Sequence, residues 1–277
     1  MAQFDESKSK NPVLNRATAV YDPAQYQAMA QAAAQNGTPV PVRPEAVTDG
    51  AMTLTDVVMK TSLSLIVLVG AAVVGWQFLT NSWVVVIVCM FAALGVGIAN
   101  SVMRKINPIL VLLYSVLEGL FLGAISATFQ HYYSASSPNS SLGIVGNAVL
   151  ATIITFAVTL ALVASGVVRV TPRFQKMVII AMVSYLIFGL ISLVSALFGV
   201  GGGWGFYGLG GLGIILCLFG VALAAMSLVL DFGAIQQALV YGVPERESWR
   251  FAYGLTVTLV WLYLELLRLF AILQGRN

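Results

Sequence analysis

The chain has 277 residues, of which 59% are hydrophobic and 9% are charged, and its formal net charge at pH 7 is +3. A water-soluble domain of this composition would lack the polar residues needed to cover its surface. The small net charge, without a block of basic residues, also argues against a nucleic-acid-binding protein. The composition therefore predicts an integral membrane protein.

Residues 1–51 differ in composition from the rest of the chain, because they are rich in Gln, Ala, Pro and polar residues. Lys8 and Lys10 precede no long apolar run of the kind found in a secretory signal peptide. The segment 24–35 has helix-forming residues but few large apolar side chains to bury. We expect a disordered tail, with a docking segment as the alternative, followed by a membrane domain over residues 52–277.

Seven apolar runs follow, each long enough to cross a bilayer core of about 30 Å as a helix. None alternates in hydropathy as a barrel strand would. Thr55 is expected to cap a short helix on the membrane surface before the first run, and Gly95, Gly97 and Ala99 are expected to permit close helix packing in the second. The sequence predicts an all-α integral membrane protein with spans at 61–79, 83–100, 109–130, 145–168, 176–199, 209–231 and 252–273.

The seventh run carries two charged residues, Glu265 and Arg268, within an otherwise apolar sequence. Residues three apart lie on one face of a helix. Charges inside a membrane segment face protein or water, because exposure to lipid is costly. We therefore expect the seventh helix to lie at the centre of the bundle.

The basic residues between the spans predict the orientation in the membrane. Three connections, 80–82, 131–144 and 200–208, contain no Lys or Arg. The positive-inside rule then places the N-terminal tail in the cytoplasm and the C-terminus outside, in a plasma membrane, since no organelle-targeting presequence is found. The basic residues are in the other three connections: Arg104, Lys105, Arg169, Arg173, Lys176, Arg246 and Arg250.

Three acidic residues lie in or at the end of a span, namely Glu118, Asp231 and Glu265. At 1.5 Å per residue, Glu118 lies about 14 Å and Glu265 about 20 Å along its helix, near the middle of the bilayer. Asp231 ends the sixth run, close to the cytoplasmic surface. On one interpretation the two glutamates are structural, one of them pairing with Arg268 in a polar seam. On the other, the carboxylates line a cation or proton pathway.

No residue pattern indicates catalysis or a bound cofactor. The spans contain no GxSxG, HExxH or paired-aspartate motif, and the glycine-rich run 199–211 lacks the GxxxxGK[ST] pattern. The single histidine, His131, and the separate cysteines, Cys89 and Cys217, do not form a metal-binding motif. We expect a protein that is not an enzyme and holds no cofactor or structural metal.

Several stretches carry a resemblance to a known family: residues 228–239 around Asp231, residues 266–270, and the segments 11–13 and 52–56. Together with the seven-span layout they resemble the Bax inhibitor-1 family, also called the transmembrane Bax inhibitor motif or YccA-like family, over about residues 52–273. The last two segments resemble those of its bacterial members. The resemblance implies a pH-sensitive calcium leak channel, here in a bacterial inner membrane. The alternative that it implies is a non-transporting interaction protein that modulates a membrane quality-control protease.

The resemblance also implies a gating centre made of two aspartates on helices six and seven and an arginine near the end of helix two. Asp231 matches the first aspartate, and Arg104 matches the arginine. For the second aspartate, one register gives Glu265 and the other, aligned on the Leu-Leu-Arg ending, gives Thr258. We favour Thr258, because that register also places Arg268 on the family's buried arginine.

An aspartate that faces a threonine loses the shared-proton coupling of a carboxylate pair. We therefore expect Asp231 to be latched by Arg104, and protonation of Asp231 to weaken this latch. A deeper triad of Glu118, Glu265 and Arg268 is expected to carry any cation or proton coupling. The partners expected are the lipid bilayer, calcium or other cations and, for the alternative function, a membrane protease.

Overall fold

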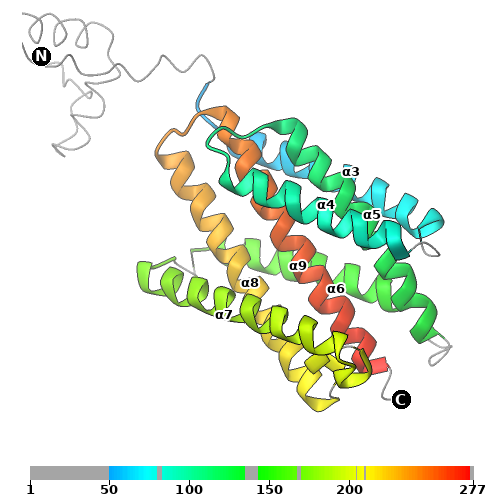
Figure 1. Cartoon of the computed structure of the whole chain (residues 1–277). Coiled ribbons are helices and arrows are strands. Elements are labelled where there is room, and N and C mark those ends of the chain that lie inside the picture. Colours follow the sequence, from blue (N-terminus) through cyan, green and yellow to red (C-terminus); the bar gives the residue numbers. More distant parts are fainter. Residues whose placement is uncertain are drawn as a thin grey trace, which may run out of the picture. The chain divides into compact units, whose positions relative to one another are not determined.

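The computed structural model describes residues 50–79, 83–134, 143–166, 170–203, 205–208 and 210–274. Within these residues the regular structure consists of seven long α-helices and three short 3-10 turns (Figure 1). The predicted tail lies outside the described residues, apart from its last two. The elements are α3 (Leu54–Phe78), α4 (Trp83–Val102), α5 (Pro108–Ser134), α6 (Gly143–Ala164), α7 (Pro172–Leu197), η1 (Val200–Gly203), η2 (Gly205–Gly208), α8 (Gly211–Val240), η3 (Glu245–Glu247) and α9 (Ser248–Gln274).

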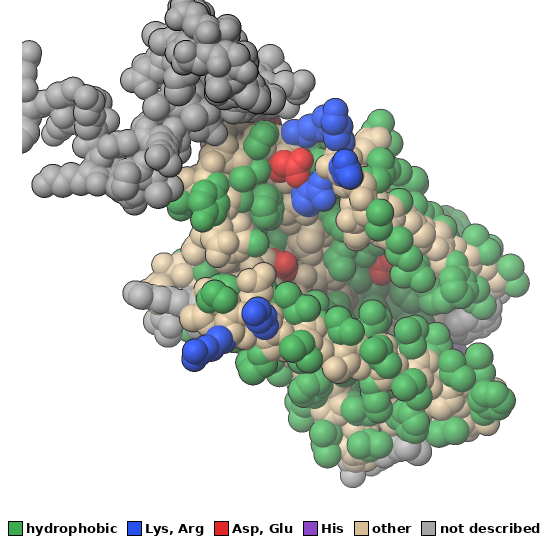
Figure 2. Space-filling model, turned by 60° about the vertical axis from the view of Figure 1, so that its left-hand side comes forward, with side chains coloured by type: hydrophobic (Ala, Val, Ile, Leu, Met, Phe, Trp, Pro, Cys, Tyr) green, Lys and Arg blue, Asp and Glu red, His purple; other side chains and the backbone are tan. Residues whose placement is uncertain are grey.

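All seven long helices are apolar enough and long enough to cross a membrane. Their order and approximate bounds agree with the seven predicted spans, so the all-α membrane fold is confirmed. Many large apolar side chains are exposed on the seven helices, and they spread over the face that Figure 2 shows, as expected for a surface that contacts lipid. The chain is therefore a multi-pass protein of the lipid bilayer.

The first helix begins differently from the prediction. Thr53, not Thr55, is the N-cap: its side-chain oxygen accepts a hydrogen bond from the backbone N–H of Asp56 at 3.2 Å. The Asp56 carboxylate accepts one in return from the Thr53 N–H at 2.8 Å, which completes a capping box. From Leu54 the helix runs without a break to Phe78, so there is no separate surface helix.

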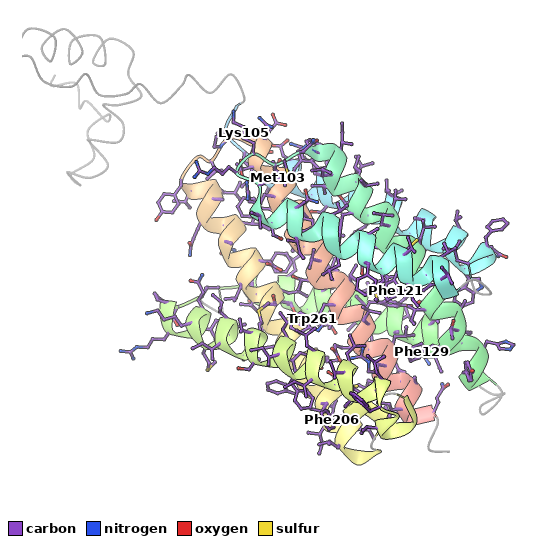
Figure 3. All side chains as sticks on the ribbon, viewed as in Figure 1. Met103, Lys105, Phe121, Phe129, Phe206 and Trp261 are labelled. Atoms are coloured by element: carbon purple, nitrogen blue, oxygen red, sulfur yellow. The ribbon has the colours of Figure 1, made fainter. Side chains whose placement is uncertain are left out.

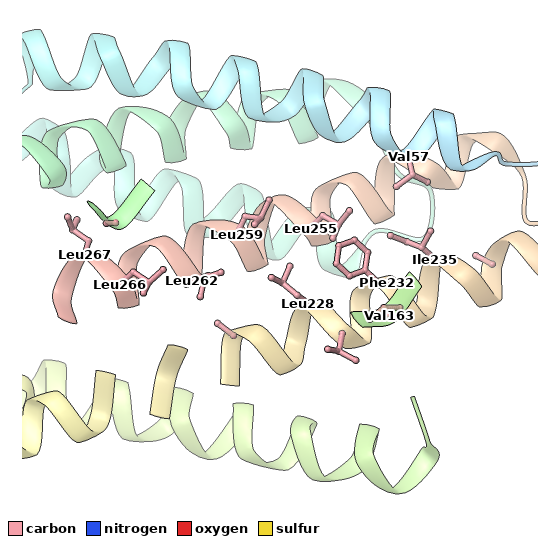
Figure 4. Close-up of a cluster of buried hydrophobic side chains, with 14 of the residues drawn as sticks. Val57, Val163, Leu228, Phe232, Ile235, Leu255, Leu259, Leu262, Leu266 and Leu267 are labelled. Carbon is pink, nitrogen blue, oxygen red and sulfur yellow. The ribbon is translucent and has the colours of Figure 1, made fainter. Parts of the chain in front are cut away.

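Helix α9 is the centre of the bundle, as predicted. It packs against α3, α5, α6 and α8, and a larger share of it is buried than of any other described span. Leu228 of α8 and Leu262 of α9 are both fully buried between these two helices, in the cluster that Figure 4 shows. Burying α9 on most sides removes the Glu265 carboxylate from contact with lipid, while Arg268 stays partly exposed.

The tightest helix contact is between α3 and α5, and glycines make it possible. A Cβ atom on Gly119 would lie 2.3 Å from the carbonyl oxygen of Leu68, and one on Gly123 would lie 1.9 Å from that of Ala72. These two glycines are four residues apart and form a GxxxG pattern on one face of α5. The predicted role of Gly95 is wrong, because a Cβ there would meet no atom within 4 Å.

Candidate functional site

The polar side chains inside the bundle lie in separate places along α9. Asp231 and Thr258 form one site, which we call the Asp231 site. Glu265, Arg268, Trp261, Tyr185 and Tyr207 form a second group, the Glu265 cluster. Acidic side chains are visible in a recess on one face of the bundle, among apolar and uncharged neighbours (Figure 2).

The Asp231 site joins α8 to α9. Asp231 is half-buried, and its Oδ2 accepts a hydrogen bond from Thr258 Oγ1 at 2.7 Å. The structure therefore brings together Asp231 and Thr258, the residue that the favoured register places opposite it. Helix α8 continues past Asp231 to Val240, which at 1.5 Å per residue is about 13 Å further. The predicted end of the sixth span at Asp231 is thus wrong, since the helix continues for nine residues beyond it.

Arg104 lies outside the Asp231 site. It is exposed in the connection between α4 and α5, and its carbonyl oxygen accepts a hydrogen bond from Arg250 Nη2 at 3.0 Å. In the part of the chain that the structure describes, no hydrogen bond or ion pair joins Arg104 to Asp231. The latch between these two residues stays a prediction.

The Glu265 cluster surrounds a carboxylate that is only 3% exposed. Arg268 Nη1 lies 3.4 Å from Glu265 Oε2, which makes an ion pair within α9. Trp261 Nε1 donates a hydrogen bond to Oε1 at 3.2 Å, and the hydroxyl of Tyr185 donates another at 3.0 Å. The guanidinium and the two hydrogen-bond donors replace most of the hydration that this buried carboxylate has lost.

Residues of α7, α8 and η2 complete the Glu265 cluster. The hydroxyl of Tyr207 donates to that of Tyr185 at 2.9 Å, and the Arg268 guanidinium lies 4.4 Å from the centre of the Tyr207 ring. Burial raises the pKa of Tyr207. Gly220 allows the carboxylate to approach α8, since a Cβ there would lie 2.7 Å from Glu265 Cδ.

Sequence reasoning missed the two tyrosines and Gly220. Trp261 could have been found, because it lies one helical turn before Glu265 on the same face of α9. Tyr185 and Tyr207 come from other segments of the chain, and no spacing in the sequence links them to Glu265.

Glu118 lies apart from the Glu265 cluster. It is half-buried on α5, near the phenol groups of Tyr114 and Tyr253, which pack edge to face with ring centres 5.2 Å apart. From the residues that the structure describes, no hydrogen bond or ion pair reaches its carboxylate. Of the expected triad, the structure therefore pairs Glu265 with Arg268 and leaves Glu118 outside this pair.

The carboxylates inside the bundle therefore have different surroundings. Thr258 and Glu265 are seven residues apart on α9, or about 10 Å along the helix. At that spacing the Asp231 and Glu265 carboxylates do not share a proton, so each can titrate separately. Carboxylate oxygens can also bind a hard cation such as calcium.

Comparison with protein families gives a match over nearly the whole chain. A family model described as "Bax inhibitor 1 like" matches residues 11–275, which include all seven long helices. No curated protein matches the chain.

Proposed function

The chain belongs to the Bax inhibitor 1-like family, and from this premise we propose that it is a pH-sensitive pathway for cations across a cell membrane, with calcium as the preferred ion. The proposal is that intramembrane carboxylates line this pathway and set its pH dependence. The proposal includes no catalytic step.

The observation that carries the proposal is the Asp231 site. Asp231 lies within a membrane span, and its carboxylate is bonded to the neutral hydroxyl of Thr258. A carboxylate in a membrane segment without a cationic partner is costly, so its presence there suggests a function. Glu118, in α5, is a second carboxylate without a cationic partner among the described residues. Both can bind a passing cation.

For gating we propose a change of partner at Asp231. In the present structure it accepts a hydrogen bond from Thr258. In a closed state, Arg104 would move from the α4–α5 connection to Asp231 and form a charge-assisted bond. Protonation of Asp231 would remove the charge that holds this latch, so a lower pH would favour opening.

For the location we propose a bacterial inner membrane with the N-terminal tail in the cytoplasm. Basic side chains are found at the ends of helices that would face the cytoplasm in this orientation, including Lys60 at 3.0 Å from Glu245 and Arg250 at 2.7 Å from Glu247. This distribution is the one that the positive-inside rule expects.

The test is calcium flux into liposomes that hold the purified chain, measured from about pH 6 to about pH 8. The variants are Asp231→Asn and the double variant Glu118→Gln, Glu265→Gln. We expect flux in the parent that rises as the pH falls, and an altered pH profile in Asp231→Asn. The matched control is Asp56→Asn, which removes the partly exposed carboxylate of the capping box at the start of α3 and should leave the flux unchanged. Identical flux from Asp231→Asn and the parent at every pH would contradict the gating proposal.

The second candidate function is a non-transporting interaction protein that modulates a membrane quality-control protease. One observation favours it: residues of α3, α5, α6 and α9 line a cavity of about 600 Å³, and most of these side chains are apolar. Such an opening in a membrane domain could receive a helix of a partner protein. A bilayer that stays tight to calcium at every pH, with all variants folded, would favour this candidate.

A further inference from the structure

Hydroxyl groups connect the Glu265 carboxylate with the end of the bundle where α7 and α8 are joined. The Tyr207 hydroxyl donates to the Tyr185 oxygen at 2.9 Å, and the Tyr185 hydroxyl donates to Glu265 Oε1 at 3.0 Å. Tyr207 lies in η2, outside the membrane-spanning helices, and is half-buried. The two bonds therefore form an unbroken chain from the connection to a carboxylate that is almost fully buried.

The surroundings of the two tyrosines keep this chain in place. The ring of Tyr207 lies against the Arg268 guanidinium, and the ring of Tyr185 lies 6.0 Å, centre to centre, from that of Trp261. Figure 3 shows Trp261 on α9 beside α7 and α8. The Tyr185 oxygen also lies 3.3 Å from the carbonyl oxygen of Leu216, so its proton has two acceptors to choose between. A hydroxyl with alternative acceptors can reorient, as a proton carrier must.

We propose that Tyr207 and Tyr185 are a proton relay, through which the Glu265 carboxylate exchanges protons with water at the α7–α8 connection. The inference rests on the proposed exchange of protons at intramembrane carboxylates, and it does not require that calcium passes through the protein.

Each transfer in the relay conserves atoms and charge. A hydronium ion gives a proton to the Tyr207 oxygen and becomes water, as the Tyr207 hydroxyl gives its own proton to the Tyr185 oxygen. Tyr185 in turn gives its original proton to Glu265 Oε1, which becomes a neutral carboxylic acid. Both tyrosines end with one hydroxyl proton each, and rotation of the two hydroxyls restores the starting arrangement.

Charged and titratable groups face Glu265 from each described element that packs against this residue. Arg268 on α9 is the cation, and Tyr185 on α7 and Tyr207 in η2 are the two phenols. Cys217 on α8 is the remaining titratable group, and it is fully buried. Because Arg268 favours the ionised carboxylate and burial opposes it, a change in pH can shift the balance between the two forms.

Trp261 provides the measurement. Because its indole N–H donates to Glu265 Oε1, its fluorescence should respond when the carboxylate becomes neutral. The purified full chain is mixed rapidly with buffer that lowers the pH from about 8 to about 6, and the fluorescence change is followed in time. Loss of the change in Glu265→Gln and in Trp261→Phe assigns the signal to this pair.

We expect Tyr207→Phe to slow the change at least about a hundredfold, the lower end of what a positioned proton donor contributes. The final fluorescence at each pH should stay close to that of the parent, because Phe keeps the ring that contacts Arg268. Tyr185→Phe should slow the change as well. The matched control is Phe206→Leu, which alters the neighbouring residue of η2 without removing a hydroxyl and should leave the rate unchanged.

Equal rates in the parent and both Phe variants would overturn the relay. So would a pH-dependent signal that persists in Glu265→Gln, or a Tyr207→Phe variant in which only the final fluorescence changes. Absence of calcium flux in liposomes would contradict the proposed pathway while leaving these rates as expected, so the two proposals can fail separately.

Discussion

Replacing Gly123 by Ala tests the packing of α3 on α5. The added Cβ would lie 1.9 Å from the Ala72 carbonyl oxygen, whereas ordinary contact begins at 3.4 Å, so the shortfall is 3.4 − 1.9 = 1.5 Å. The obstacle is backbone in the middle of a helix and cannot rotate away as a side chain can. The two helices would have to separate, which loses packing along their whole contact. Overpacking costs about 1–3 kcal/mol, and for a backbone clash we expect about 3 kcal/mol.

The measurement is thermal unfolding in detergent. For a domain of this size about 1 kcal/mol shifts Tm by about 2–4 °C, so Gly123→Ala should lower Tm by about 6–12 °C. The control is Gly70→Ala on α3, where a Cβ meets no atom within 4 Å. That variant should keep or slightly raise Tm, because Ala favours a helix over Gly by about 1 kcal/mol. A Gly123→Ala protein that melts together with the parent would show that α3 and α5 can separate at no cost, and the packing argument would be wrong.

Three further predictions concern the polar sites. Thr258→Val removes the hydroxyl that donates to Asp231 at 2.7 Å and should lower the free energy of unfolding by about 1.5–3 kcal/mol. Thr258→Ser keeps a hydroxyl and should retain most of the parent's stability. Denaturation of both variants checks this. Gly220→Ala places a Cβ 2.7 Å from Glu265 Cδ, so it should displace the carboxylate, cost about 1–3 kcal/mol and shift the tryptophan emission. Burial raises the pKa of Tyr207, so the unfolded chain loses the phenol proton at a lower pH than the folded chain does. The stability of the fold should therefore decrease as the pH rises above about 10. Thermal unfolding at alkaline pH should show a smaller decrease for Tyr207→Phe.

Composition and the lengths of the apolar runs were sufficient to predict the membrane fold and its seven spans. The central place of α9 followed from Glu265 and Arg268, because charged residues in a span must be turned away from lipid. The sequence also contains the GxxxG pattern at Gly119 and Gly123, whereas the prediction placed close packing at Gly95, Gly97 and Ala99. Such patterns do not reveal which partner helix the glycines face.

The end of α8 was predicted nine residues early, because hydropathy falls at Asp231 and the following segment includes two glutamines. Phe232, Ile235 and Ala238 are nevertheless buried at helical spacing, so one apolar face continues to the end of the helix. The Glu265 cluster could be predicted only in part, since Glu265 and Arg268 lie on one helix while Tyr185 comes from α7. Contacts between segments far apart in the chain depend on packing that spacing alone does not specify.

The central place of α9 has a consequence for how the protein is made. Helix α9 follows the other six long helices in the chain, yet it contacts α3, α5, α6 and α8. During synthesis those helices leave the ribosome and enter the bilayer before α9 exists. They therefore cannot reach their final packing at once and must stay loosely associated, with a lateral opening wide enough to admit another helix. Completion of the bundle is then a single late event that depends on the insertion of α9.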